Sequence, residues 1–116
     1  MALTKVSAAV LKDDAVSYDK LGAEFTTAAA ISASNVDFSS AQVFTKTLTA
    51  DTILTFSNVS TGMVKDLVIT GNFTLTLPAS VKIVAGEYSG TVSNLIQIVS
   101  TNGATEQWAS ISQQAV

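Results

Sequence analysis

The stretch Phe73-Thr-Leu-Thr-Leu77 decides the fold class, because it has the cleanest alternation of apolar and polar side chains in the chain. Successive side chains of a strand point to opposite faces, so the phenylalanine and the two leucines share one face and the threonines share the other. Residues 42–112 continue this pattern, with threonine or serine between valine, isoleucine and phenylalanine. These residue types fit a half-buried pleated surface. The sequence therefore predicts a small all-β domain.

Turn residues divide this region into expected strands. Gly71-Asn72 predicts a two-residue turn of type II′, because glycine at its first position accepts a positive φ. The resulting hairpin joins residues 63–70 to residues 73–77 and places Val68 opposite Leu75. Further strands are expected at residues 42–48, 52–57, 81–84 and 91–100.

The last turn decides where the single tryptophan points. A two-residue turn at 102–103 would place Trp108 opposite Gln97, whereas a three-residue loop at 102–104 would place it opposite Ile98. We favour the three-residue loop, because it pairs large apolar side chains. Trp108 is then expected to be a packed core residue or an interface anchor. A platform on which a sugar ring stacks is the alternative role.

The composition argues against several classes of function. The chain has 116 residues, the length of one domain, and 13% of them are charged, against about 25% in a typical soluble domain. Its formal net charge is −3, so the positive surface needed to bind nucleic acid is missing. The chain has neither cysteine nor histidine, so it lacks thiolate nucleophiles and the commonest general base and metal ligand. We expect no nucleic-acid partner, catalytic residue, metal or cofactor.

Residues 1–40 differ in character from the rest of the chain. They are rich in alanine and serine, and they contain one short expected helix at residues 17–25, with Ser17 as its cap. The apolar run at residues 6–11 ends at Lys12 and is shorter than the core of a signal peptide. No run approaches the ~20 apolar residues of a membrane span, so we expect no membrane insertion. We predict an N-terminal anchoring arm at residues 1–40 and a β domain at residues 41–116.

Three segments resemble the small β-sandwich modules of bacteriophage virion proteins, which occur in head fibres, capsid decorations and tail-fibre tips. They are Phe44-Thr-Lys-Thr-Leu-Thr-Ala-Asp-Thr-Ile-Leu-Thr-Phe-Ser-Asn58, Leu77-Pro-Ala-Ser-Val-Lys82, and the run Leu95-Ile-Gln-Ile-Val99 that precedes a turn and Trp108. The segment Asp13-Asp14-Ala-Val-Ser-Tyr-Asp-Lys-Leu-Gly22 resembles the linker units found ahead of such modules. The resemblance implies a small antiparallel β-sandwich of jelly-roll-like form, made in the host cytoplasm and located in the virion.

Energetic considerations agree with an assembled protein. A β domain of this size without disulfides or metal has a small core, and oligomerisation is a usual remedy. Together with the resemblance, this leads us to expect a non-enzymatic homotrimer, anchored to a capsid or tail protein through residues 1–40. Phe44, Phe56 and Ile111 are the candidates for burial between chains.

The main alternative is a carbohydrate- or receptor-binding module such as a tail-fibre tip. Tyr88 and Trp108 are its candidate ligand-binding residues, and a host surface glycan would be its partner.

The remaining polar groups do not indicate a binding site. Asp13-Asp14 lacks the spacing of a calcium loop and is expected to be a solvated turn. Lys46, Lys65 and Lys82 are expected to be exposed charges that protect strand edges.

Overall fold

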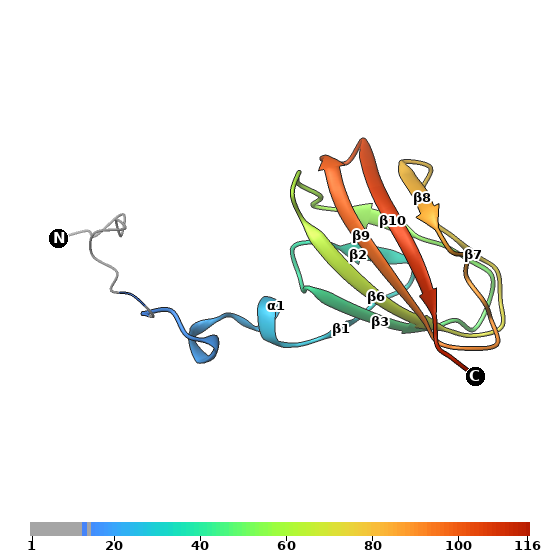
Figure 1. Cartoon of the computed structure of the whole chain (residues 1–116), viewed down its shortest axis with the longest axis horizontal. Coiled ribbons are helices and arrows are strands. Elements are labelled where there is room, and N and C mark those ends of the chain that lie inside the picture. The colour runs from blue at the N-terminus through green and yellow to red at the C-terminus, as the bar shows by residue number, and fades with distance from the viewer. Residues whose placement is uncertain (1–12, 14) are drawn as a thin grey trace.

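The computed structural model describes residue 13 and residues 15–116, and it consists mainly of β-strands (Figure 1). Helical structure in this part of the chain is limited to a 3₁₀ turn, Tyr18–Lys20, and to α1, Ala23–Thr26. The strands are β1 Ala29–Ala30, β2 Asn35–Asp37, β3 Val43–Thr47, β4 Thr52–Ile53, β5 Thr55–Ser57, β6 Val64–Thr70, β7 Leu75–Thr76, β8 Val81–Ala85, β9 Asn94–Asn102 and β10 Glu106–Gln113. The prediction of an all-β fold is confirmed.

The main sheet has six strands in the order β1-β3-β6-β9-β10-β8. Only the pairs β6-β9 and β9-β10 of this sheet are antiparallel, whereas β1-β3, β3-β6 and β10-β8 are parallel. Two smaller sheets, β2-β5 and β4-β7, are also parallel pairs. The prediction of a purely antiparallel fold is therefore wrong. Its cause is the route of the chain: β4 and β5 enter the smaller sheets before β6 returns beside β3, and strands joined by such a crossover run in the same direction.

Gly71 directs the chain out of the main sheet and does not close the predicted hairpin. Its φ of +117° is of the expected sign, but a Cβ at this position would lie 2.6 Å from the carbonyl oxygen of Leu48. The backbone packs against the residue that follows β3 and then continues to β7, which pairs with β4. Val68 consequently lies opposite Leu95 of β9, and its predicted pairing with Leu75 is wrong.

The hairpin of β9 and β10 is one residue away from the predicted register. Trp108 lies opposite Val99, not opposite Ile98. The ladder is irregular between Glu106 and Gln107, and a bulge of this kind adds a residue to one strand. Because a one-residue change of register moves a side chain to the other face of a sheet, Trp108 points outward, whereas Ile98 is buried.

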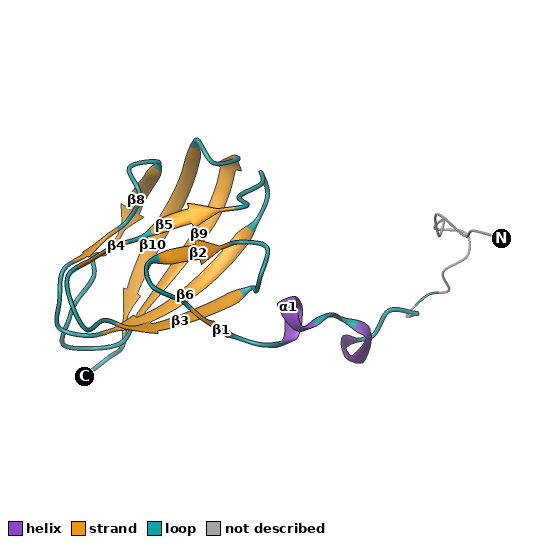
Figure 2. Ribbon diagram, turned by 180° about the vertical axis from the view of Figure 1, so that it is seen from behind, coloured by secondary structure: helices purple, strands orange, loops and turns teal. Residues whose placement is uncertain are grey.

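The hydrophobic core lies between the main sheet and the strands that cross it. Figure 2 shows β2, β4 and β5 in front of the main sheet. The rings of Phe38 and Phe56 pack with their centroids 4.9 Å apart in this space. The buried apolar residues are Ile31, Val36, Phe38, Ala41, Phe44, Leu48, Leu54, Leu67, Ile69, Ile96, Ile98, Ala109 and Ile111.

The β fold begins at Ala29, so the predicted domain boundary at residue 40 is wrong. β1 pairs with β3 in the main sheet and β2 pairs with β5. Val36 and Phe38 are fully buried at 0% exposure. Residues 29–40 were expected to be an arm because they lack a long periodic pattern. They are short strands whose apolar residues are ordered only by contacts with distant parts of the chain.

The described part of the arm, residue 13 and residues 15–28, extends away from the β fold (Figure 1). The predicted continuous helix at residues 17–25 is interrupted, because Gly22 is extended with ψ of 163°. Ser17 precedes the 3₁₀ turn, but its side chain makes no capping hydrogen bond. Glycine is a poor helix former, and the result is two separate short turns. The apolar run at residues 6–11, which was predicted to be too short for the core of a signal peptide, lies outside the described residues.

Candidate functional site

The side of the main sheet that faces away from the core is the first candidate site. We call it the outer face and define it by the outward side chains of β3, β6, β9 and β10, together with Lys82 of β8. Burial alternates along β6 and along β9 from Asn94 to Thr101, so every second residue of these stretches belongs to this face. The outer face comprises Val43, Thr45, Thr47, Val64, Asp66, Val68, Thr70, Lys82, Leu95, Gln97, Val99, Thr101, Glu106, Trp108, Ser110 and Ser112.

Cross-strand pairing places the apolar members of the outer face side by side. Val64 lies opposite Val99, which lies opposite Trp108 on its other side. Further along the same strands, Val68 lies opposite Leu95. These five side chains are between 36% and 55% exposed. They form two apolar rows that no described segment of the chain covers.

A polar row separates the two apolar rows. Asp66 lies opposite Gln97, which lies opposite Ser110. The Oδ1 atom of Asp66 is buried, and no described residue donates a hydrogen bond to it. A buried polar atom without a partner is costly, so this carboxylate oxygen stands out in the middle of the outer face.

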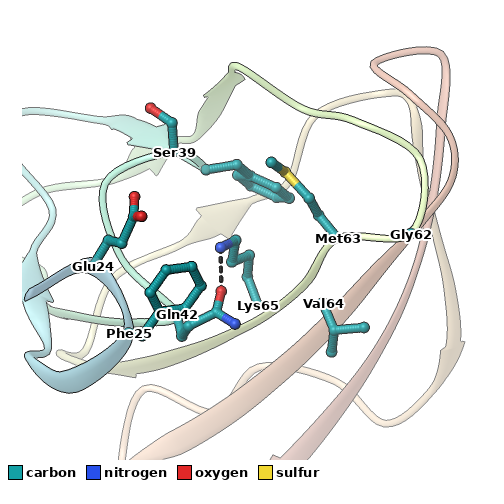
Figure 3. A pocket seen from close by; sticks show the side chains of 9 residues that line it. Glu24, Phe25, Ser39, Gln42, Gly62, Met63, Val64 and Lys65 are labelled. Carbon is teal, nitrogen blue, oxygen red and sulfur yellow. Dashed lines mark hydrogen bonds between the residues drawn. The ribbon is translucent and has the colours of Figure 1, made fainter. Parts of the chain in front are cut away.

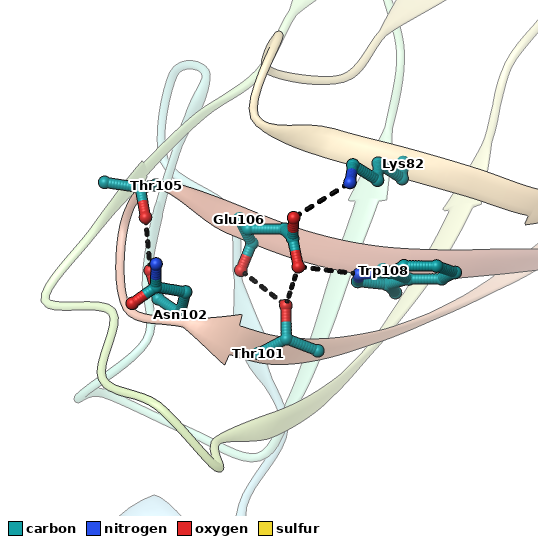
Figure 4. Close-up of polar contacts among 6 residues, drawn as sticks. All are labelled: Lys82, Thr101, Asn102, Thr105, Glu106 and Trp108. Atoms are coloured by element: carbon teal, nitrogen blue, oxygen red, sulfur yellow. Dashed lines mark hydrogen bonds and ion pairs between the residues drawn. The ribbon is translucent and has the colours of Figure 1, made fainter.

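Trp108 is held by a cluster of polar contacts at the edge of the outer face (Figure 4). Its indole Nε1 donates a hydrogen bond of 3.0 Å to Oε1 of Glu106. Lys82 donates a hydrogen bond of 2.8 Å to Oε2 of the same carboxylate, and its Nζ lies 5.3 Å from the centroid of the Trp108 ring. Thr101 donates a third hydrogen bond, of 2.7 Å, to Oε1. The indole is therefore fixed in orientation before any ligand or partner arrives.

These contacts change the acidity of Glu106. The hydrogen bond from the Lys82 ammonium, followed by those from Thr101 and Trp108, lowers the pKa of the Glu106 carboxyl to about 2. Hydrogen bonds to the ionised form stabilise that form. Glu106 is therefore a charge-bearing member of the cluster at neutral pH, and its charge is balanced by Lys82.

Tyr88, the second predicted ligand-binding residue, lies at a separate place. Its hydroxyl donates a hydrogen bond of 2.6 Å to the carbonyl oxygen of Gly71, and its ring packs against the core. Burial raises the pKa of the Tyr88 hydroxyl. Tyr88 lines a hollow with Phe73 and Ile111, whereas the hollow beside Trp108 is lined by other residues. The structure does not bring the two aromatic side chains into one described pocket.

The three predicted interface residues lie inside the chain. Phe44 and Ile111 are 2% and 7% exposed and belong to the core. Phe56 is half-buried, and its ring packs against that of Phe38 at an interplanar angle of 44°. Their burial is achieved within one chain. Their outward neighbours, such as Val43 beside Phe44, belong to the outer face because side chains alternate along a strand.

Lys65 was predicted to be an exposed edge charge, and this prediction is wrong. It points inward from β6, is 6% exposed and hydrogen-bonds Oε1 of Gln42 (Figure 3). It lines a hollow of about 540 Å³ where α1 approaches the β fold, together with Phe25 and Met63. Burial lowers the pKa of the Lys65 ammonium, and the nearby Glu24 carboxylate opposes this effect. Residues of the arm and of the β fold therefore both line this hollow, which contains the buried Lys65 ammonium.

The described residues form neither a metal-binding cluster nor a membrane-spanning helix. No three histidine, cysteine or acidic residues within this part of the chain are grouped so that they could hold a metal ion. Asp13 is exposed, and Asp14, its predicted partner in a solvated turn, lies outside the described residues. No described helix is long and apolar enough to span a membrane.

The sequence prediction missed Val64, Val68, Leu95 and Val99 as surface residues. The sequence placed these residues on strands, but it did not show which face of each strand is buried. Lys65 and Asn94 obscured the pattern, because they are polar but lie on the buried side. The signal that could have found the surface residues is the polar residue in each outward set, Asp66 in β6 and Gln97 in β9. No protein-family model, curated protein or solved structure matches this chain. Function is therefore inferred from the residues of the chain itself.

Proposed function

We propose that this protein is a non-enzymatic structural protein of a bacteriophage virion. In this proposal it is a homotrimeric head fibre or capsid decoration protein, made in the host cytoplasm and anchored by its arm to a capsid or tail protein. The observation that carries the proposal is the exposure of apolar side chains along the arm. Val16, Tyr18, Leu21 and Phe25 are between 40% and 69% exposed. Exposed apolar groups that lie close together are typical of a segment that docks onto a partner.

The division between the arm and the β fold supports this proposal. The β fold has its own core, which begins with Ile31. No described residue of the arm belongs to that core, so this part of the arm is available for a partner. The anchoring segment is residues 1–28 in this proposal, because residues 29–40 are strands and core.

We also infer that the β fold is a small sandwich. The main sheet forms one layer, and β2-β5 with β4-β7 form the other. The buried residues between the layers come from both, for example Leu54 from the crossing segment and Leu67 from β6. A sandwich of this kind leaves one face of the larger sheet free for contacts with other molecules.

Virions of the phage that encodes the chain provide the test. Antibodies against the purified protein should label these virions, and particles that lack the protein should bind the added wild-type chain. The double variant Leu21→Ser with Phe25→Ser should lose this binding. Ile53→Ser is the matched control, because Ile53 is 68% exposed but lies on the β fold. Unlabelled virions would overturn the virion assignment, and full binding by the double variant would overturn anchoring by the arm.

A carbohydrate- or receptor-binding module remains the second candidate, because Trp108 is exposed beside hydroxyl groups. The indole is 39% exposed and its Nε1 hydrogen is already engaged by Glu106. Only the face of the ring is left to stack on a sugar. A glycan array with wild-type, Trp108→Ala and Tyr88→Ala chains tests this function. Binding that Trp108→Ala abolishes would favour it over the structural role, and an array without hits would count against it.

A further inference from the structure

We propose that the outer face is the surface through which copies of this chain associate. Each copy packs its outer face against the outer faces of two others around a three-fold axis. This inference rests on the homotrimer of the proposed function and identifies the surface that forms it. Figure 1 looks onto this face, and the described part of the arm does not cross it.

The outer face carries two rows of exposed apolar side chains. An antiparallel sheet that turns one face to water has polar side chains on that face. Here the outward positions of β6 and β9 include Val64, Val68, Leu95 and Val99, and Trp108 continues the row onto β10. Each remains at least 36% exposed in the single chain. Contiguous exposed apolar side chains of this kind mark interaction surfaces.

The polar row of the outer face fits another copy of the chain as the partner. The polar row contains an acceptor and a donor side by side, since Asp66 accepts hydrogen bonds and the Gln97 amide donates them. Around a three-fold axis, Gln97 of one copy can donate to Asp66 of the next. The same face thus supplies both halves of the contact.

The charges of the outer face agree with self-association. Lys82 and Glu106 neutralise each other within the chain at a distance of 2.8 Å. Asp66 is then the unbalanced charge of this face. A strongly acidic or basic partner would meet no surface of strong opposite charge here. A single polar row between apolar rows is also a known way to fix the register of an assembly.

The size of the face is adequate. Strands lie about 4.8 Å apart and rise about 3.3 Å per residue. From β3 to β8, along the nine residues of β9, the face measures roughly 20 by 30 Å. This footprint of roughly 600 Å² is divided between two neighbouring copies, so a trimer buries roughly 1,800 Å² in total over its three contacts, which is within the range of a standard interface.

The experiment measures the native mass and the tryptophan emission of the full chain over a wide concentration range. Trp108 is the single tryptophan, so its emission reports directly on the outer face. We expect a trimer whose emission shifts to the red when dilution dissociates it. The double variant Val68→Thr with Val99→Thr keeps β-branched side chains and should weaken association at least tenfold. Val99→Asp should abolish association.

Ile53→Asp is the matched control. It places the same charge on another exposed β residue, 68% exposed and outside the outer face, and should remain trimeric. Circular dichroism reports whether each variant folds. If Val99→Asp does not fold, the double variant Val68→Thr with Val99→Thr provides the test. A trimer that the outer-face variants leave intact, or a trimer whose Trp108 emission does not change on dilution, would overturn this inference alone. A wild-type monomer at all concentrations would overturn the homotrimer as well.

Discussion

Nε1 of Trp108 donates a hydrogen bond to Oε1 of Glu106, two residues earlier on the same face of β10. The side chains of residues i and i+2 share a face of a strand, so the alternation of side chains along β10 brings Glu106 and Trp108 together. It links the single tryptophan to the carboxylate with the most strongly lowered pKa among the described residues. Changes in the charge of Glu106 should therefore alter the environment of Trp108.

The first prediction concerns the acid sensitivity of the fold. The pKa of Glu106 is lowered from 4.5 to about 2, so its ionised form stabilises the folded state above pH 4.5. This contribution should be lost as the pH falls from about 4.5 to about 2. Thermal unfolding measured across this range should show a weaker pH dependence in Glu106→Gln, and its Trp108 emission should differ from that of the wild type.

Asp37→Asn is the control for this experiment. Hydrogen bonds from Ser39 and Asn58 also lower the pKa of the Asp37 carboxyl, but Asp37 lies on β2. This variant should weaken the pH dependence without altering the emission of Trp108. Glu106→Gln with an unchanged pH profile would show that the cluster does not stabilise the fold.

The second prediction separates the arm from the fold. Removing residues 1–28 should change the free energy of unfolding by less than about 1 kcal/mol, because the deletion ends before β1. Removing residues 1–40 should prevent folding, because it deletes Val36 and Phe38 from the core. Phe38→Ala alone should cost about 3–5 kcal/mol. Urea denaturation of the three variants measures these differences, and a stable chain that begins at residue 41 would contradict the placement of β1 and β2.

The third prediction concerns Gly86, where the chain leaves β8. Its φ is +77°, and an added Cβ would lie 1.9 Å from the carbonyl oxygen of Ile111. Gly86→Ala should therefore destabilise the fold by more than the 1–3 kcal/mol, roughly, that backbone strain alone costs. Gly62→Ala provides the comparison, because Gly62 has φ of +89° but no atom within 4 Å of the added Cβ. Equal losses of stability in the two variants would rule out the close contact with Ile111.

The fourth prediction concerns Asn94, a buried polar residue in the inward set of β9. Its Nδ2 donates to the carbonyl oxygens of Ile69, Ser89 and Val92, and its Oδ1 accepts from the backbone of Ser89. Asn94→Leu should cost about 1–3 kcal/mol, because these groups lose their partner in a buried site. Hydrogen exchange in the loop before β9 should increase at the same time.

Gln113→Leu is the matched control for Asn94→Leu. Gln113 is exposed and donates one hydrogen bond of 2.9 Å to the carbonyl oxygen of Glu87. Its loss should change stability by no more than about 0.5 kcal/mol, as for most surface positions. A loss of stability in Gln113→Leu equal to that in Asn94→Leu would show that burial of the amide is not the cause.

The fifth prediction concerns the buried ammonium of Lys65. Its pKa is lowered mainly by burial, which means that the folded state binds the proton less tightly than the unfolded state does. The resulting penalty is present below the folded pKa and is relieved as the pH rises toward 10.5. Lys65→Met should therefore be at least as stable as the wild type at pH 7. Thermal unfolding at pH 7 and pH 10 measures this, and a large loss of stability in Lys65→Met at pH 7 would contradict it.

The alternation of residues 73–77 and the threonine-rich segments around them determined the β class from the sequence alone, because a period of two residues belongs to strands. Gly71 likewise has the positive φ that its sequence context predicted. Both are local properties of the backbone. The predicted helix at residues 17–25 was shortened for an equally local reason, the glycine within it.

Only the tertiary structure decided which strands pair and which side of each strand faces the core. Val68 pairs with Leu95, and β7 pairs with β4 in a separate sheet, because the packing of Gly71 on Leu48 takes the chain out of the main sheet. A single bulge at Glu106 turned Trp108 outward, since alternation gives every residue a side but does not say which side is buried. The pairing of strands and the choice of which face of each strand is buried depend on contacts between residues far apart in the chain. These contacts carry no local sequence signal.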